Sequence, residues 1–174
     1  MKKIFLLIKF LLFIGITNLS LANANIVYVD MDKVLTLSKT GSSLLKQFDE
    51  LDKKNLDQFN KSEKNLIKKE NNLISQKKIL SEVDFKNKLN ELRLEVQNYN
   101  KKKKKILNDS GKKKQLNTNN FLIMINPILT KFSDDNKISL ILKKKDIIIG
   151  KSNLDITDKI IELVDKNIKK IKIK

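Results

Sequence analysis

The chain has 174 residues, and its 37 lysine and arginine residues against 20 aspartate and glutamate residues give a formal net charge of +17. It contains no cysteine and no histidine, which excludes disulfides, thiolate nucleophiles, cysteine-ligated metals and imidazole chemistry. Four glycines and one proline leave no room for a glycine-rich phosphate loop, so the composition predicts a protein that is not an enzyme and needs no cofactor.

The first 24 residues have the pattern of a signal peptide. Lys2 and Lys3 precede an apolar stretch over residues 4–16, and the small residues around Ala24 fit a cleavage site. A transmembrane anchor is the alternative, but these thirteen residues fall short of the ~20 that span a bilayer. We therefore expect cleavage after Ala24, export, and a mature chain 25–174 with a net charge of +14.

A short apolar run opens the mature chain, within a first body segment at residues 25–40. Ile26, Val27, Tyr28 and Val29 are mostly β-branched or aromatic, which is typical of a buried strand. We take these four residues as the candidate strand through which copies of the chain join.

Residues 41–133 form a long tract in which apolar residues recur at helical spacing. The expected seam consists of Phe59, Leu66, Leu73, Leu80, Phe85, Leu89, Leu92, Val96, Tyr99 and Ile106. Lys103 occupies the polar position of this seam. Ser81 followed by Asp84 is typical of a helix start, so the tract is predicted to turn near residues 80–84 and fold back as an antiparallel helical hairpin.

The seam also predicts the register of the hairpin, because facing residues in an antiparallel pair have a constant sum of residue numbers. Phe59 then faces Ile106, and Asp52, where the apolar ladder fails, faces Lys113. We predict an ion pair between Asp52 and Lys113, worth ~0.5 kcal/mol if it is exposed.

The second helix of the hairpin weakens toward its end. Between residues 108 and 120 only Leu116 is apolar, and Gly111 costs ~1 kcal/mol relative to alanine. We expect bending or looseness in this segment. Pro127 is expected to kink the helix or to end it near Asn126.

The last segment, 134–174, completes the body. Two β-rich runs at residues 138–142 and 147–150 predict a β-hairpin, and an amphipathic helix is expected to follow with Asp155 or Thr157 as its N-cap. A basic tail ends the chain. The two body segments together hold 57 residues, too few to support themselves without disulfides or metal, so we expect oligomerisation.

Most of the charge lies on the arm, where 21 basic and 11 acidic residues give a net charge of +10. Such a surface attracts acidic unfolded chains and anionic membranes. The candidate basic residues facing a bound protein are Lys101, Lys102, Lys104, Lys105, Lys112 and Lys114. A set of merely solvated helix faces is the alternative reading of these lysines.

The order of these segments resembles the Skp (OmpH-like) family of periplasmic chaperones over nearly the whole mature chain. The resemblance rests on the opening strand at 26–31, the helical hairpin turning at 80–82, the run at 138–142 and the Asp-Ile-Thr sequence within 154–158. It implies an α+β fold with a small β-rich trimerisation body and a long antiparallel helical-hairpin (coiled-coil) arm. It also implies a homotrimer that holds unfolded outer-membrane β-barrel proteins between its arms without ATP.

The expected partners are therefore unfolded outer-membrane proteins and further copies of the chain, with an anionic membrane surface or lipopolysaccharide as a further candidate. Nucleic acid is not expected, because Arg93 is the only arginine and the aromatic residues are not interleaved for base stacking. The alternative function is a structural coiled-coil tether in the cell envelope that binds a folded partner.

Overall fold

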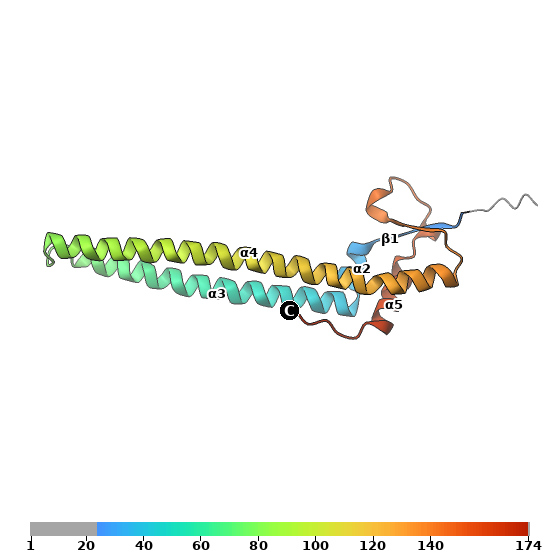
Figure 1. Ribbon diagram of the computed structural model, residues 1–174, viewed down its shortest axis with the longest axis horizontal. Coiled ribbons are helices and arrows are strands. Elements are labelled where there is room, and N and C mark those ends of the chain that lie inside the picture. Colours follow the sequence, from blue (N-terminus) through green and yellow to red (C-terminus); the bar gives the residue numbers. More distant parts are fainter. Residues whose placement is uncertain (1–23, 174) are drawn as a thin grey trace, which may run out of the picture.

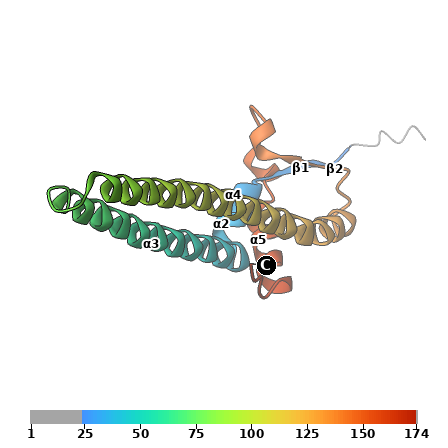
Figure 2. The same ribbon diagram turned by 60° about the vertical axis from the view of Figure 1, so that its left-hand side comes forward.

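The structure, a computed structural model, describes residues 24–173, and the predicted signal peptide lies outside these residues apart from the exposed Ala24. A long arm of two helices projects from a small body (Figure 1), and the two helices lie side by side in both views (Figures 1 and 2). The elements in chain order are β1 (Ile26–Val29), α2 (Met31–Leu37), α3 (Lys39–Ser75), α4 (Glu82–Asp135), β2 (Leu140–Lys143), the 3-10 turns Lys144–Asp146 and Ser152–Leu154, and α5 (Thr157–Asn167).

The arm is the predicted antiparallel hairpin of α3 and α4. Its second helix begins where expected, because the Ser81 hydroxyl accepts a hydrogen bond from the Asp84 N–H at 3.1 Å. The turn between the helices occupies residues 76–81. At ~1.5 Å per residue the 54 residues of α4 extend about 80 Å, far beyond the diameter of the body.

Helix α4 does not end at Pro127, and that part of the sequence prediction is wrong. The helix is continuous through the weak segment 108–120 and through Pro127 to Asp135. Proline removes one backbone hydrogen bond, but Ile125 on one side is fully buried and Ile128 on the other is half-buried against the body. Packing of this helical face therefore outweighs the local cost of the proline.

The body holds a two-stranded sheet in which β1 and β2 run parallel, with Ile26 opposite Leu140. The predicted β-hairpin is wrong, because β2 pairs with β1 and residues 147–150 form no strand. After β2, a 3-10 turn and the Lys144–Asp155 ion pair at 2.6 Å direct the chain to the other side of β1. There the Ile156 N–H donates a hydrogen bond to the Tyr28 carbonyl at 2.9 Å. The spacing of two neighbouring β-rich runs predicted a local hairpin, but the strand contacts of this region are made to β1 instead.

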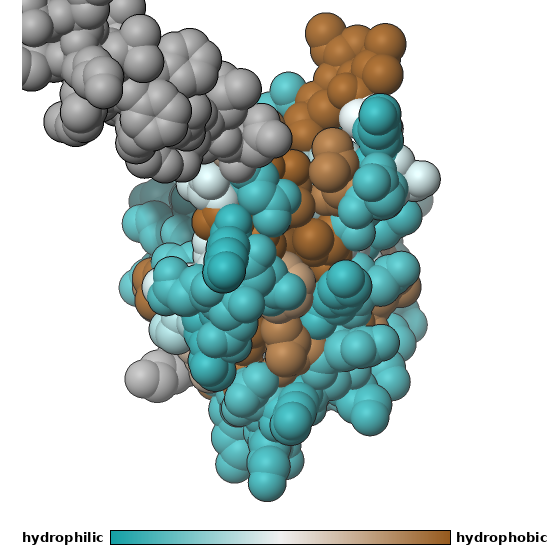
Figure 3. Space-filling view, turned by 90° about the vertical axis from the view of Figure 1, so that its right-hand side faces the viewer, coloured by the Kyte–Doolittle hydropathy of each residue, from teal (hydrophilic) through white to brown (hydrophobic). Residues whose placement is uncertain are grey.

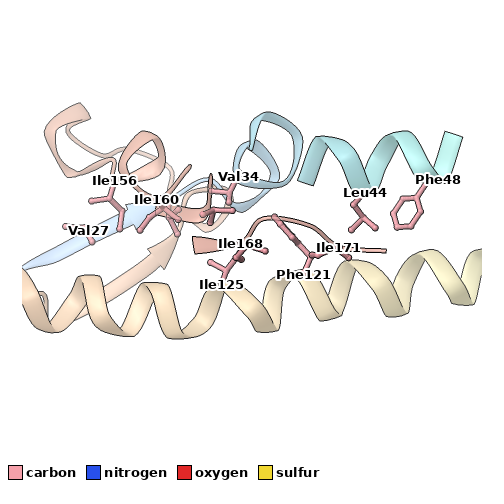
Figure 4. Close-up of a cluster of buried hydrophobic side chains, with 12 residues drawn as sticks. Val27, Val34, Leu44, Phe48, Phe121, Ile125, Ile156, Ile160, Ile168 and Ile171 are labelled. Atoms are coloured by element: carbon pink, nitrogen blue, oxygen red, sulfur yellow. The ribbon is translucent and has the colours of Figure 1, made fainter. Parts of the chain in front are cut away.

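The main apolar core lies where the body meets the base of the arm (Figure 4). Its fully buried side chains come from α2, the first turns of α3, the end of α4 and α5: Val34, Leu44, Phe121, Ile125, Ile160 and Val164. Because both arm helices contribute to this core, the arm is anchored to the body along its base. The α+β architecture of a small body and a long helical-hairpin arm is as predicted.

Candidate functional site

The arm is the candidate functional surface, and its seam residues differ in burial. Phe59 and Leu73 are buried, and Val96 is 38 % exposed. The remaining seam residues are half-buried: Leu66, Leu80, Phe85, Leu89, Leu92, Tyr99 and Ile106. Two helices joined along one narrow seam leave most of their surface open to solvent, so the arm has far more surface than it needs for its own packing.

The base half of the arm follows an 11-residue repeat instead of heptads. The buried and half-buried positions of α4 step by 3, 4 and 4 residues, as do those of α3 from Leu44 to Leu66. On α4 these positions are Lys103, Ile106, Ser110, Lys114, Asn117, Phe121, Ile125, Ile128 and Phe132. The seam residues of α4 near the base of the arm therefore still face those of α3, because both helices follow the 11-residue repeat there.

This repeat corrects the predicted ion pair by one residue. Asp52 pairs with Lys114, whereas Lys113 is exposed. A heptad carried past Ile106 places residue 113 in the seam, but the extra residue of the 11-residue repeat places Lys114 there. The acidic gap in α3 and a basic residue in α4 do meet at this level of the arm.

A double-mutant cycle should separate the two lysines. Asp52→Ala and Lys114→Ala are expected to couple by ~0.5 kcal/mol in urea unfolding followed by circular dichroism, because the pair is partly exposed. Asp52→Ala and Lys113→Ala should show no coupling. Equal coupling for both lysines would contradict the one-residue shift.

A polar cluster interrupts the seam near the middle of the arm. Glu63 Oε1 accepts hydrogen bonds from the Tyr99 hydroxyl at 2.5 Å and from Lys103 Nζ at 2.8 Å. Lys103 Nζ also lies 5.3 Å from the centre of the Phe59 ring. The seam lysine is thus satisfied by a carboxylate and an aromatic face, and Glu63 is a residue that the apolar spacing alone did not reveal.

The cluster shifts the titration of all three polar groups. The pKa of Glu63 lies below its ordinary value of 4.5, because Lys103 and Tyr99 donate hydrogen bonds to the carboxylate. The hydrogen bond that Lys103 donates to Glu63 raises the pKa of Lys103. Burial, followed by the bond to Glu63, raises the pKa of the Tyr99 hydroxyl. The charged form of Glu63 is therefore the form that the folded arm favours.

Stability should respond to acid through Glu63. Because the pKa is lower in the folded chain, the contribution is fully present above pH 4.5 and is lost as the pH falls through the folded value. Glu63→Gln should lower the melting temperature at neutral pH, and the difference from the unmodified chain should vanish in acid. Glu70→Gln, on the exposed surface one heptad later, is the control and should show little effect at either pH. A difference for Glu63→Gln that persists unchanged in acid would contradict this role.

The candidate lysines do not all have the same surroundings. Lys101, Lys102, Lys104, Lys105 and Lys112 are exposed, whereas Lys114 is half-buried in its ion pair with Asp52. Within residues 24–173 the five exposed lysines form no ion pair. They therefore leave uncompensated positive charge on the surface of α4.

Exposed apolar side chains share the arm with these lysines. Val83, Leu94 and Leu116 are 69 %, 58 % and 55 % exposed, and they share an 11-residue spacing with Lys105. This spacing corresponds to about three turns, so the four residues follow one face of α4. On α3, Ile67 and Ile74 are also exposed, each one residue after a seam position. Exposed apolar and basic side chains thus both lie on the surface of the arm.

The body has an open sheet edge and exposed apolar side chains. β1 is bordered by β2 on one side and, at Tyr28, by Asp155 on the other. Within residues 24–173, β2 has a strand neighbour on one side only, so it has an open sheet edge. Association of copies through residues 26–29 stays a prediction. Ile148 and Ile149 are 100 % and 89 % exposed. Figure 3 looks onto this end of the molecule and shows hydrophobic side chains gathered within a hydrophilic surround.

A groove of about 620 Å³ also lies on the body, between α2, α4 and β2. Its apolar lining includes Met31, Leu35, Leu122, Leu129 and Ile141. The acidic Asp30 and Asp134 and the three lysines that follow Leu142 border the same groove.

Neither a metal site nor a membrane-spanning helix is found within the described residues 24–173. Within 24–173 no group of three or more acidic side chains is placed to hold a metal ion. In the same part of the chain no helix combines the length and apolar character of a membrane span.

Comparisons with known proteins agree with this architecture. The family described as OmpH, Outer membrane protein (OmpH-like), matches residues 25–164. No curated protein matches the chain. Among solved structures, the crystal structure of a proposed outer membrane chaperone (OmpH-like) from Caulobacter crescentus superposes with a TM-score of 0.80 at 13 % identity, covering 87 % of this chain and 89 % of that one. The similarity in structure shows the shared fold, and the family match spans both the body and the whole arm; the chain therefore belongs to the OmpH-like family.

Proposed function

We propose that this chain is an ATP-independent holdase chaperone of the periplasm, which binds unfolded outer-membrane β-barrel proteins in a basic cavity between the arms of an oligomer. The observation that carries the proposal is the surface of the arm, which exposes both uncompensated lysines and apolar side chains. The description of the Caulobacter crescentus protein as a proposed outer membrane chaperone supports the same role.

The arm surface suits an unfolded chain better than a folded partner. Its exposed apolar residues are separate from one another, so each offers a weak contact that an extended chain meets at many points. The net charge of +10 attracts acidic chains over distances that salt shortens. The same lysines would attract the phosphate groups of lipopolysaccharide or of an anionic membrane surface. No cofactor and no covalent step is needed.

The proposed cavity requires several arms, and we propose a homotrimer. The open edge of β2 and the exposed Ile148 and Ile149 support association through the body, since such surfaces are rarely left free. The groove between α2, α4 and β2 offers an apolar surface of the same body to a neighbouring copy. Three arms held at one end would then surround a common space.

The direct test is suppression of aggregation. A urea-unfolded outer-membrane β-barrel protein is diluted into buffer with and without chain 25–174, and light scattering is followed. We expect suppression at about one unfolded protein per three chains, with weaker suppression as salt rises. A folded soluble protein of similar negative charge should not bind. Scattering that is unchanged at a large excess of the chain would reject the holdase function and leave the envelope tether.

A further inference from the structure

The C-terminal segment, residues 168–173, follows an unexpected course. After α5 it forms no helix or strand and runs back toward the base of α3 (Figure 1). Ile168 and Ile171 are only 7 % and 8 % exposed, whereas Lys169, Lys170 and Lys172 are exposed. The segment therefore lies on the protein as an extended chain with its isoleucines inward and its lysines outward. The family match ends at residue 164, before this segment.

Polar side chains of α3 hold this segment by its backbone. Gln47 Nε2 donates to the Ile171 carbonyl at 2.9 Å, and the Ile173 N–H donates to Gln47 Oε1 at 3.2 Å. The Thr40 hydroxyl donates to the carbonyl of Ile168. One residue of a parallel β-strand bonds its neighbour in the same way, through a carbonyl and the N–H two residues later. The Gln47 amide thus reproduces a strand contact that is independent of the bound side chains.

The apolar part of the contact is made by the side chains of Ile171 and Ile173. Ile171 packs in the core cluster with Leu44, Phe48 and Phe121, and Figure 4 shows these four side chains together. Ile173, two residues later, is half-buried against the same cluster. Within residues 24–173 the lysines of the segment form no ion pair. The surface under residues 171–173 therefore accepts an extended backbone with apolar side chains two residues apart, on either side of an exposed one.

We propose that the surface covered by the C-terminal segment is a binding site for an extended polypeptide segment with alternating apolar side chains. We call this surface, formed by Thr40, Leu44, Gln47, Phe48 and Phe121, the docking groove. The C-terminal segment occupies the site in the free protein. Transmembrane β-strands have this alternation, so the proposal rests on the proposed function and names a second contact for the same unfolded proteins. Binding of such a strand displaces the segment, which then competes with it as a tethered ligand.

A fluorescent peptide provides the test. The probe is the neutral octapeptide Asn-Ile-Ser-Ser-Ile-Ser-Ile-Ser, which keeps the isoleucines of residues 167–174 and replaces the lysines. Its fluorescence anisotropy is measured with chain 25–174 and with the double variant Ile171→Ser/Ile173→Ser, in which the segment is released. We expect at least about tenfold tighter binding to the released variant, and this difference should persist in high salt.

Two controls identify the docking groove as the site. Gln47→Ala in the released variant should weaken binding, whereas Gln58→Ala, on the exposed surface of α3, should leave it unchanged. A peptide with serine in place of its last two isoleucines should not bind. Equal binding to the released and unmodified chains, or equal effects of the two glutamine substitutions, would overturn the proposal.

A second measurement uses an otherwise unchanged segment, in case the released variant loses helical content. The chain has no cysteine, so Lys172→Cys carries a single environment-sensitive dye. We expect a saturable change in dye fluorescence when the octapeptide is added, and no change with the peptide in which serine replaces the last two isoleucines. No change at millimolar octapeptide would overturn the proposal. Loss of peptide binding with intact suppression of aggregation rejects the docking groove alone, whereas peptide binding without suppression rejects the holdase.

Discussion

Replacing Gly41 with alanine is expected to destabilise the chain by roughly 3 kcal/mol, which is a large part of the stability of a small domain. Gly41 lies in the first turn of α3, where it packs against the end of α2. A Cβ atom there would lie 2.1 Å from the Leu35 carbonyl oxygen and 2.8 Å from the Ser38 Oγ that caps the helix. Because the nearest atom belongs to the backbone, relief requires α2 and α3 to move apart.

Gly111→Ala is the matched substitution with the opposite expected sign. Gly111 lies inside α4, and an added Cβ atom would have no neighbour within 4 Å. Alanine should therefore stabilise the helix by ~1 kcal/mol, through propensity alone. Urea unfolding of chain 25–174, followed by circular dichroism at 222 nm, measures both changes. Similar effects of the two substitutions would contradict the close packing of α2 on α3.

The arm could be predicted closely because its pattern is local and repetitive. The spacing from Phe59 to Ile106 and the cap at Ser81 indicated both the hairpin and its approximate register. The prediction missed Lys114 by one residue, because a heptad was extended into a region with an 11-residue repeat. Phe121, Ile125, Ile128 and Phe132 lie one residue out of phase with the heptad that reaches Ile106, and this phase shift was a signal of the second period. The same packing explains why α4 continues through Pro127.

The body could be predicted only in part, because its contacts join distant segments. Two neighbouring β-rich runs suggested a hairpin, but β2 pairs with a strand more than 100 residues earlier in the chain. No local pattern reports such a parallel pairing. The N-cap of α5 falls at Ile156, yet the Asp155 carboxylate still accepts from the Thr157 N–H at 3.0 Å, so the local signal was close. The docking of residues 168–173 depends on Gln47, which no motif distinguishes.

The free lysines of the arm surface could also be predicted only in part. Composition alone indicated the basic arm, and five of the six candidate lysines are exposed in the structure. Sequence could not tell which lysines are already paired, because pairing depends on the register of α3 against α4. Lys103 and Lys114 are both engaged with carboxylates, so they contribute less free charge than their neighbours. The exposed group at residues 101, 102, 104 and 105 therefore contains the most concentrated free charge on the arm.

Removing that charge is expected to have the largest effect on the proposed function. The variant Lys101→Gln/Lys102→Gln/Lys104→Gln/Lys105→Gln keeps helix-forming side chains of similar length and removes four charges from each arm. The concentration of chain 25–174 needed for half-suppression of aggregation should rise by about tenfold at low ionic strength, because attraction of acidic chains weakens. At high salt the variant and the unmodified chain should approach each other, since the Debye length falls to ~3 Å at 1 M.

The matched control removes the same charge from the body. Lys137→Gln/Lys151→Gln/Lys159→Gln/Lys166→Gln alters four exposed lysines outside the arm, so the net charge of the two variants is identical. If the arms form the binding surface, the body variant should suppress aggregation nearly as well as the unmodified chain. Equal loss in both variants would mean that overall charge, and not its position on the arm, governs binding. Full activity in both would leave the exposed apolar residues of α3 and α4 as the main contact, because they are the part of the arm that neither variant changes.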